Sequence, residues 1–275
     1  MALDDLRLDR PADPASRFPP RSTASPVRWI VVAFGGVAAV ALLTFWWLSR
    51  AQPTTTMPAP TTATDVAVGS NRPKRQPIDL PTLDQSDSWL RDVVTALSQH
   101  PTLARFLATP AIIRASALAV VQIGDGKTPS VPLKALQPGS SIALQTGVGR
   151  IDPASYARWD GATAALTSIE PAAAAQLYVD MKPLLDQAYQ ELGHPGGDFD
   201  QAVIRAIETL SDTPVVIDPA VTRRPNYVEH DDAALRALPP VQKQFLLIGP
   251  ANQKKVLAWL RQVAAQLELK VQSSR

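Results

Sequence analysis

The sequence predicts a mainly α protein, in which a single transmembrane helix is followed by a helical domain with a small β element. Residues 29–48 form an apolar run without a charged residue. From about residue 81 onward, apolar residues recur at helical spacing, while Gly and Pro interrupt the stretch between residues 124 and 150. We therefore expect four segments: a cytoplasmic tail (1–28), a transmembrane helix (29–48), a Pro/Thr-rich linker (49–79) and a helical periplasmic domain (80–270).

The apolar run at residues 29–48 has the length of a membrane-spanning helix. At 1.5 Å per residue, a helix of about 20 residues spans roughly 30 Å, which is the hydrocarbon thickness of a bilayer. Trp29 stands at one end of the run, and Trp46 and Trp47 stand at the other, where aromatic rings favour the membrane interface. The run is longer than the apolar region of a signal peptide. We expect an uncleaved anchor, and cleavage after Ala51 is the alternative.

Arginines close to this run predict its orientation. Arg17, Arg21 and Arg28 precede it, whereas only Arg50 follows it closely. Basic residues near a span stay on the cytoplasmic side of the membrane. We therefore expect a single-pass protein of the bacterial inner membrane, with its N-terminus in the cytoplasm and its C-terminal domain in the periplasm.

The composition excludes several classes of chemistry. The sequence has no cysteine, which excludes disulfides, Cys-ligated zinc, iron–sulfur clusters and thiol catalysis. Its 27 basic and 25 acidic residues give a net charge of +2, but the basic excess precedes Pro77 and the rest of the chain is close to neutral. A nucleic-acid-binding domain carries its Lys and Arg as a patch on the folded part. We find no such patch and expect no nucleic-acid partner.

Capping residues and prolines predict where the helices begin. Asp152 and Pro153 are expected to start a helix that runs through Tyr156 and Trp159, which would place this aromatic pair in the core. Asp198 is expected to cap a later helix. Further helix starts are predicted at Ser86 or Asp87, Pro101, Pro110, Pro239 and Pro250.

Other Gly and Pro residues predict breaks and a small β element. Pro183 should kink or divide a long helix that Gly193 ends. Between Gly124 and Arg150, the short stretches 131–136 and 141–145 are expected to pair as a hairpin.

The turn between residues 189 and 199 carries the weak candidates for ligand or partner binding. Glu191 and His194 have the Glu-x-x-His spacing of di-iron bundles, but the sequence holds no second copy. Asp198 follows two glycines in a run that resembles a calcium loop but lacks its remaining ligands. We expect no metal and interpret the turn as structural. The alternative is that Glu191, His194 and Asp198 face a ligand or partner.

The remaining motifs support no enzyme class. Residues 229–232 gather three carboxylates and a histidine, and helix capping explains them better than a metal site. Residues 124–127 lack the leading glycine and the helix of a phosphate loop. No GxSxG, HExxH or GxGxxG motif occurs. The catalytic residues therefore stay unknown, and no cofactor is expected.

Three runs carry a resemblance to a known family. They are residues 152–160 (DPASYARWD), 183–199 (PLLDQAYQELGHPGGDF) and 248–252 (IGPAN). These runs are similar to motifs of the bacterial domain-of-unknown-function family numbered 3014, and the resemblance covers roughly Leu80 to Leu267. It implies an inner-membrane protein with one N-terminal span and a Pro-rich linker, and it implies no activity, substrate or cofactor. His194 stands where the family has a tyrosine.

We expect a membrane-anchored cell-envelope protein of unknown activity, with a non-enzymatic domain that binds another envelope protein or a wall component. The alternatives are an envelope enzyme, such as a hydrolase that uses the carboxylates of Glu191 and Asp198, and a small-ligand sensor. An enzyme needs a polar cleft with perturbed groups, whereas an interaction module exposes an apolar patch. The partners expected are the lipid bilayer through residues 29–48 and, with weak support from the small residues Gly35 and Ala39, a second copy of the chain.

Overall fold

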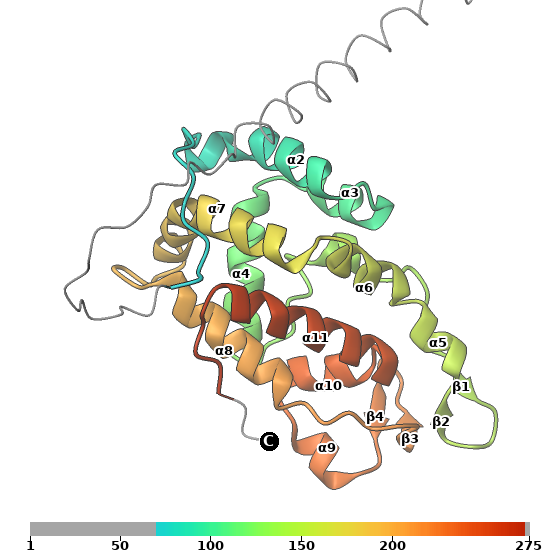
Figure 1. Cartoon of the computed structure of the whole chain (residues 1–275). Helices are drawn as coiled ribbons and strands as arrows, with labels where there is room; N and C mark the ends of the chain where they lie inside the picture. Colours follow the sequence, from blue (N-terminus) through green and yellow to red (C-terminus); the bar gives the residue numbers. More distant parts are fainter. Residues whose placement is uncertain (1–69, 273–275) are drawn as a thin grey trace, which may run out of the picture. The chain divides into compact units, whose positions relative to one another are not determined.

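The computed structural model describes residues 70–272. The expected tail, transmembrane helix and most of the expected linker lie outside the described residues. The described part is mainly helical with two short hairpins (Figure 1), which confirms the predicted mainly α class and its small β element. Within residues 70–272, no single helix is long and apolar enough to cross a membrane, and one pair of helices, bent by 103°, meets that requirement only by length and composition.

Ten helices and two hairpins form the described part of the chain. The helices are α2 (Ser86–Leu97), α3 (Pro101–Leu107), α4 (Ile112–Gly124), α5 (Pro153–Ala157), α6 (Asp160–Thr167), α7 (Pro171–Glu191), α8 (Phe199–Ser211), α9 (Ala233–Ala237), α10 (Pro240–Leu246) and α11 (Pro250–Gln266). The 3-10 turns are η2 (Leu83–Gln85) and η3 (Lys134–Leu136). Strand β1 (Leu144–Gln145) pairs antiparallel with β2 (Arg150–Ile151), and β3 (Val221–Arg223) pairs antiparallel with β4 (Val228–His230).

Most of the predicted helix starts are confirmed. The Asp152 carboxylate accepts a hydrogen bond from Ala154 N at 2.9 Å, and α3, α10 and α11 begin at prolines. The single helix expected after Pro153 is wrong, because α5 and α6 are separate. At their junction Trp159 N donates to the Tyr156 carbonyl at 3.0 Å in a tight turn, and the two aromatic residues therefore lie on different elements.

The predicted hairpin between residues 131–136 and 141–145 is also wrong. The first stretch ends in η3, and β1 pairs instead with β2. Gly147 and Gly149 adopt φ of 74° and 65° between these strands, which is the conformation that a tight hairpin turn requires. Helix α7 continues through Pro183 without a division and ends before Gly193, whose φ is 94°.

Two apolar clusters form the larger part of the core. The first cluster contains buried side chains of α2, α3, α4, α7 and α8, including Ile112, Ile113 and Phe199. The second cluster contains Phe245, Ile248, Val256 and Leu257, with Trp159, Leu166, Leu210 and Leu260 packed against them. Helix α4 lies at the centre, because it packs against α8, α7 and α2. The two clusters remain distinct and leave a cavity between them.

The residues just before the first helix lie along the domain. Gln76 N donates to Asp180 Oδ1 at 2.8 Å, and Gln176 Nε2 donates to the Lys74 carbonyl at 3.0 Å. Arg72 Nη2 forms an ion pair with Asp200 at 2.8 Å. The last ten residues of the expected linker are therefore fastened to α7 and α8.

Side chains of α2 hold the junction between α3 and α4. The Asp87 carboxylate accepts hydrogen bonds from Ala111 N and Ile112 N, both at 2.8 Å, and so caps α4 instead of its own helix. Arg91 Nε donates to the Leu107 carbonyl at 2.6 Å, at the end of α3. Ala111 has a left-handed φ of 52°, so the chain turns sharply at this point.

We expect Asp87→Ala to lower the free energy of unfolding by about 1–2 kcal/mol, because two amides at the start of a helix lose their acceptor. Urea denaturation of the full chain measures the change. Asp92→Ala is the matched control, since Asp92 is an exposed aspartate on the same helix and its loss should change stability little. Equal effects of the two substitutions would contradict the capping role.

Candidate ligand-binding cavity

An apolar cavity of about 670 Å³ lies among α4, α6, α10 and α11. Its volume falls within the roughly 300–1,000 Å³ typical of small-molecule sites. On one side it is lined by Leu103, Phe106 and Val120, which pack against the first cluster. On the other side it is lined by most residues of the second cluster. The cavity thus occupies the space in which two apolar surfaces would otherwise pack together.

Small side chains leave this space open. Ala119 of α4 faces the cavity, as do Ala162 and Ala165 of α6. A larger apolar residue at these positions would fill the volume, since a well-packed core leaves few voids larger than a water molecule. The cavity therefore exists because α4 and α6 carry alanines at these positions.

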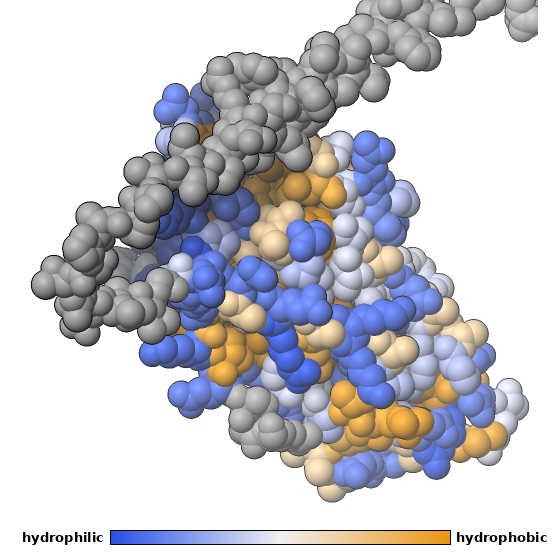
Figure 2. Space-filling model, in the orientation of Figure 1, coloured by the Kyte–Doolittle hydropathy of each residue, from blue (hydrophilic) through white to orange (hydrophobic). Residues whose placement is uncertain are grey.

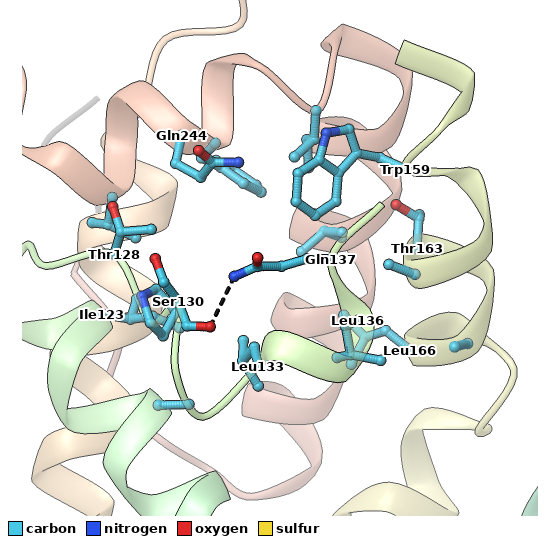
Figure 3. A pocket seen from close by; sticks show the side chains of 18 of the residues that line it. Ile123, Thr128, Ser130, Leu133, Leu136, Gln137, Trp159, Thr163, Leu166 and Gln244 are labelled. Carbon is cyan, nitrogen blue, oxygen red and sulfur yellow. Dashed lines mark hydrogen bonds between the residues drawn. The ribbon is translucent and has the colours of Figure 1, made fainter. Parts of the chain in front are cut away.

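The loop of residues 128–140 forms one wall of the cavity. The 3-10 turn η3 lies within it, and Leu133 and Leu136 line the cavity together with Gln137. Gln137 Nε2 donates to the Ser130 carbonyl at 2.8 Å and closes the loop on itself. Figure 3 shows this hydrogen bond and the indole of Trp159, which points from the α5–α6 junction toward Gln137.

Two adjacent residues supply polar donors to the cavity. Among the described residues that line it, Arg158 alone has an ionisable side chain. Arg158 Nη1 donates to the Ser140 carbonyl at 2.9 Å, while Arg158 Nε and Trp159 Nε1 are buried without an acceptor. Burial lowers the pKa of Arg158. By contrast, Trp259 Nε1 donates to the Ile169 carbonyl at 2.7 Å, as buried indoles usually do.

Two of the family-like runs meet where they position Arg158 and Trp159. Asn252 Nδ2 donates to the Tyr156 carbonyl at 3.3 Å and to Asp160 Oδ1 at 2.9 Å. Gly249 has a φ of 87°, and a Cβ added there would lie 2.6 Å from Tyr156 Cγ. Only glycine allows this approach. The start of α11 therefore contacts both the end of α5 and the start of α6, on either side of Arg158 and Trp159.

The three candidate residues of the turn do not form one site, because each has a different partner. Glu191 pairs with Arg114 at 2.6 Å, and the hydrogen bond from this guanidinium lowers the pKa of Glu191. The His194 ring stacks on Tyr189 with centroids 4.2 Å apart. Asp198 accepts from Asp200 N at 3.0 Å, which confirms its predicted capping role. None of the three lines the cavity.

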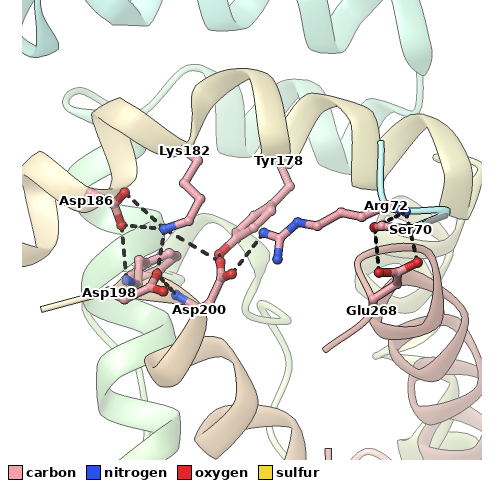
Figure 4. Close-up of polar contacts among 9 residues, drawn as sticks. Ser70, Arg72, Tyr178, Lys182, Asp186, Asp198, Asp200 and Glu268 are labelled. Carbon is pink, nitrogen blue, oxygen red and sulfur yellow. Dashed lines mark hydrogen bonds and ion pairs between the residues drawn. The ribbon is translucent and has the colours of Figure 1, made fainter. Parts of the chain in front are cut away.

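Asp198 also belongs to a polar network between α7 and α8 (Figure 4). Lys182 Nζ lies 2.6 Å from Asp198 and 2.8 Å from Asp186. Partial burial opposes ionisation of Asp198, but its hydrogen bonds to Lys182 and to a backbone amide outweigh this effect and lower its pKa. Tyr178 Oη donates to Asp200 at 2.6 Å, and Arg72 reaches the same carboxylate from the other side. The network fastens α7 to α8.

The cavity lies apart from the acidic side chains described above. Within residues 70–272, no three His, Asp or Glu side chains are gathered to hold a metal ion. The carboxylates of the network face Lys182 and Arg72, and no carboxylate lines the cavity among the described residues. Sequence reasoning did not identify Arg158 and Trp159 as site residues. The signal was their position inside the family-like run of residues 152–160, of which only Tyr156 and Trp159 were predicted to lie in the core.

The fold and the cavity define a helical domain with an apolar pocket between its two larger core clusters. A family model described as "Protein of unknown function (DUF3014)" matches residues 112–264. The chain belongs to this family, as its sequence motifs indicated. The match includes every residue that lines the cavity except Leu103 and Phe106. No curated protein and no solved structure matches the chain.

The acidic cluster at residues 229–232 is divided among separate roles. Asp232 caps α9 by accepting from Ala234 N at 2.7 Å, as predicted, and Glu229 pairs with Arg224. His230 is only 3% exposed, and neither of its ring nitrogens has a hydrogen-bond partner. Burial lowers the pKa of His230; Asp231 and Asp232 oppose this shift, and Lys243 adds to it.

We expect stability to fall as the pH drops below about 6.5, the pKa of an unperturbed histidine. Because the folded-state pKa of His230 is lowered, the unfolded chain takes up this proton first as the pH falls. The stability that neutral His230 contributes is therefore complete above about pH 6.5 and is lost below it. Carboxylates with lowered pKa values lose their contributions to stability only nearer about pH 4. Urea midpoints of the full chain, measured between about pH 7 and pH 5, should fall less in His230→Leu than in the wild type. His194→Gln is the control and should keep the wild-type slope; an unchanged slope in His230→Leu would refute the assignment.

Proposed function

We propose that this chain is a membrane-anchored cell-envelope protein whose domain binds a predominantly apolar small molecule. The cavity between the two apolar clusters is the observation that carries the proposal. Apolar walls with a few convergent polar groups are the usual character of a small-molecule site. This corresponds to the small-ligand alternative of the sequence analysis.

The alternative of a carboxylate-based hydrolase has less support. Glu191 is occupied by Arg114, and Asp198 is occupied by Lys182 and by the start of α8. The pKa of each carboxyl group is lowered, whereas a general acid at neutral pH needs a raised pKa. Neither group lies at the cavity, where an apolar substrate would bind.

The membrane anchor is proposed from the sequence. The charge-free run of residues 29–48 and the three arginines that precede it favour a single span with the domain in the periplasm. A domain held beside a bilayer is close to a reservoir of apolar molecules. The anchor and the cavity therefore support one function.

A protein-interaction role is the second candidate, because apolar side chains are exposed at one end of the domain. Val148, Ile217 and Tyr227 are each more than half exposed. Figure 2 shows apolar side chains gathered over the end of the domain that holds α9, β3 and β4. Exposed apolar patches mark interaction surfaces more often than chance. An envelope partner bound there would leave the cavity free.

We expect the full chain to bind straight-chain alcohols with an affinity that rises about fourfold for each added methylene, because burial of a CH₂ group contributes about 0.8 kcal/mol. The increase should stop when the cavity is full. Isothermal titration calorimetry with a chain-length series measures this, and a negative heat-capacity change should accompany binding.

Ala162→Phe should abolish this binding, because its ring would occupy the cavity. Ala164→Phe is the matched control, since Ala164 is exposed on the same helix and does not line the cavity. Weak binding with no dependence on chain length, or equal binding by both variants, would refute the cavity as the site and would leave the exposed apolar end as the better-supported feature.

The proposed orientation is tested by fusions in a bacterial cell. Alkaline phosphatase fused after Leu267 should be active, and the same enzyme fused after Phe18 should be inactive, because its disulfides form only in the periplasm. The reverse pattern would refute the orientation. A mature chain that begins near Gln52 would show that the segment is cleaved after Ala51.

A further inference from the structure

We propose that the ligand is an anionic amphiphile, with an acyl chain in the apolar cavity and an acidic head group bound by Arg158 and Trp159. This inference rests on the proposed function, because it assigns the chemical class of the molecule in the same cavity. It goes further by giving the ligand a charge and an orientation.

The first argument is the pair of buried donors without acceptors. Arg158 Nε and Trp159 Nε1 belong to adjacent residues that both line the cavity, and neither has a hydrogen-bond partner among the described residues. Buried polar groups are paired in the great majority of cases, and an unpaired one needs an explanation. A ligand oxygen would give both donors an acceptor.

The second argument is charge. Arg158 forms no ion pair within residues 70–272, whereas Arg72, Arg114 and Arg224 each pair with a carboxylate. Its guanidinium lies 5.9 Å from the centre of the Trp159 ring, a distance at which the ring attracts the cation. A partly buried arginine without an anion is costly. A carboxylate or phosphate would neutralise it and accept more than one of its N–H groups.

The third argument is that these donors are fixed in place. Arg158 Nη1 is held by the Ser140 carbonyl of the loop wall, and the backbone before Trp159 is held by Asn252 and by contact with Gly249. Donors that are ordered before binding lose little entropy when the ligand arrives. The rest of the wall is apolar apart from neutral side chains such as Thr128, Gln137 and Gln244, which suits a hydrocarbon chain.

Native mass spectrometry of the full chain with hexadecanoate and with 1-hexadecanol tests the head group. The wild type should bind the acid about ten- to a hundredfold more tightly than the alcohol, which is the range for hydrogen bonds to a charged group. Arg158→Gln should weaken acid binding about ten- to a hundredfold relative to alcohol binding, so that the two probes bind about equally. Trp159→Phe keeps the ring but lacks the N–H, and should reduce acid binding severalfold. Arg261→Gln, an exposed arginine on α11, is the matched control and should behave as the wild type.

A third probe, a lysophosphatidate with the same chain, distinguishes the source of the acidic group. Tighter binding of hexadecanoate than of lysophosphatidate supports a free fatty acid, and the opposite order supports a phospholipid-derived ligand. Equal binding of acid and alcohol by the wild type would overturn the head-group assignment while leaving the cavity function intact, and this comparison requires no variant to fold. Binding of neither probe would overturn both proposals. Loss of all probes in Ala162→Phe, but not in Ala164→Phe, separates cavity binding from adsorption.

Discussion

The burial of α4 is the constraint on which the rest of the described structure depends. Its sequence is apolar on several faces, and a helix of that kind must be covered on all sides. Ile112, Ile113 and Ala117 contribute to the first apolar cluster, which α2, α7 and α8 complete. The side that carries Ala119 and Ile123 faces the cavity instead. The second cluster and the loop of residues 128–140 lie opposite this side of α4 without packing tightly against it. The cavity is the space that remains between them.

Two of the three family-like runs, residues 152–160 and 248–252, are connected with this site through backbone packing. The left-handed Gly249 allows α11 to begin against the Tyr156 ring, and Asn252 completes the contact by hydrogen bonding to the end of α5 and the start of α6. These groups do not line the apolar cavity themselves. They fix the direction in which the chain leaves α5, and hence the direction in which Trp159 faces the cavity.

Helix caps were predictable from neighbouring residues, whereas the pairing of the first hairpin, the break between α5 and α6 and the features that depend on distant packing were not. Asp152 and Asp198 cap the helices that directly follow them, because capping needs only a few residues of local geometry. Asp87 shows the limit. It begins a helix but caps α4, which starts more than twenty residues later. The cavity could not be predicted for the same reason, since the alanines on α4 and α6 leave a space only when the two helices are packed in the folded domain.

The domain keeps its carboxylates apart from its cavity, and this separation bears on how a ligand would be selected. Lys182 and Arg72 neutralise the aspartates between α7 and α8, so those charges are already satisfied within the fold. The cavity contains one cation and no carboxylate among the described residues that line it. Apolar walls accept hydrocarbon of many shapes and so contribute affinity with little discrimination. Buried donors discriminate strongly, because a ligand without an acceptor leaves them unpaired. Specificity in this domain would therefore depend on the α5–α6 junction, while the size of the ligand would be set by the small residues on α4 and α6.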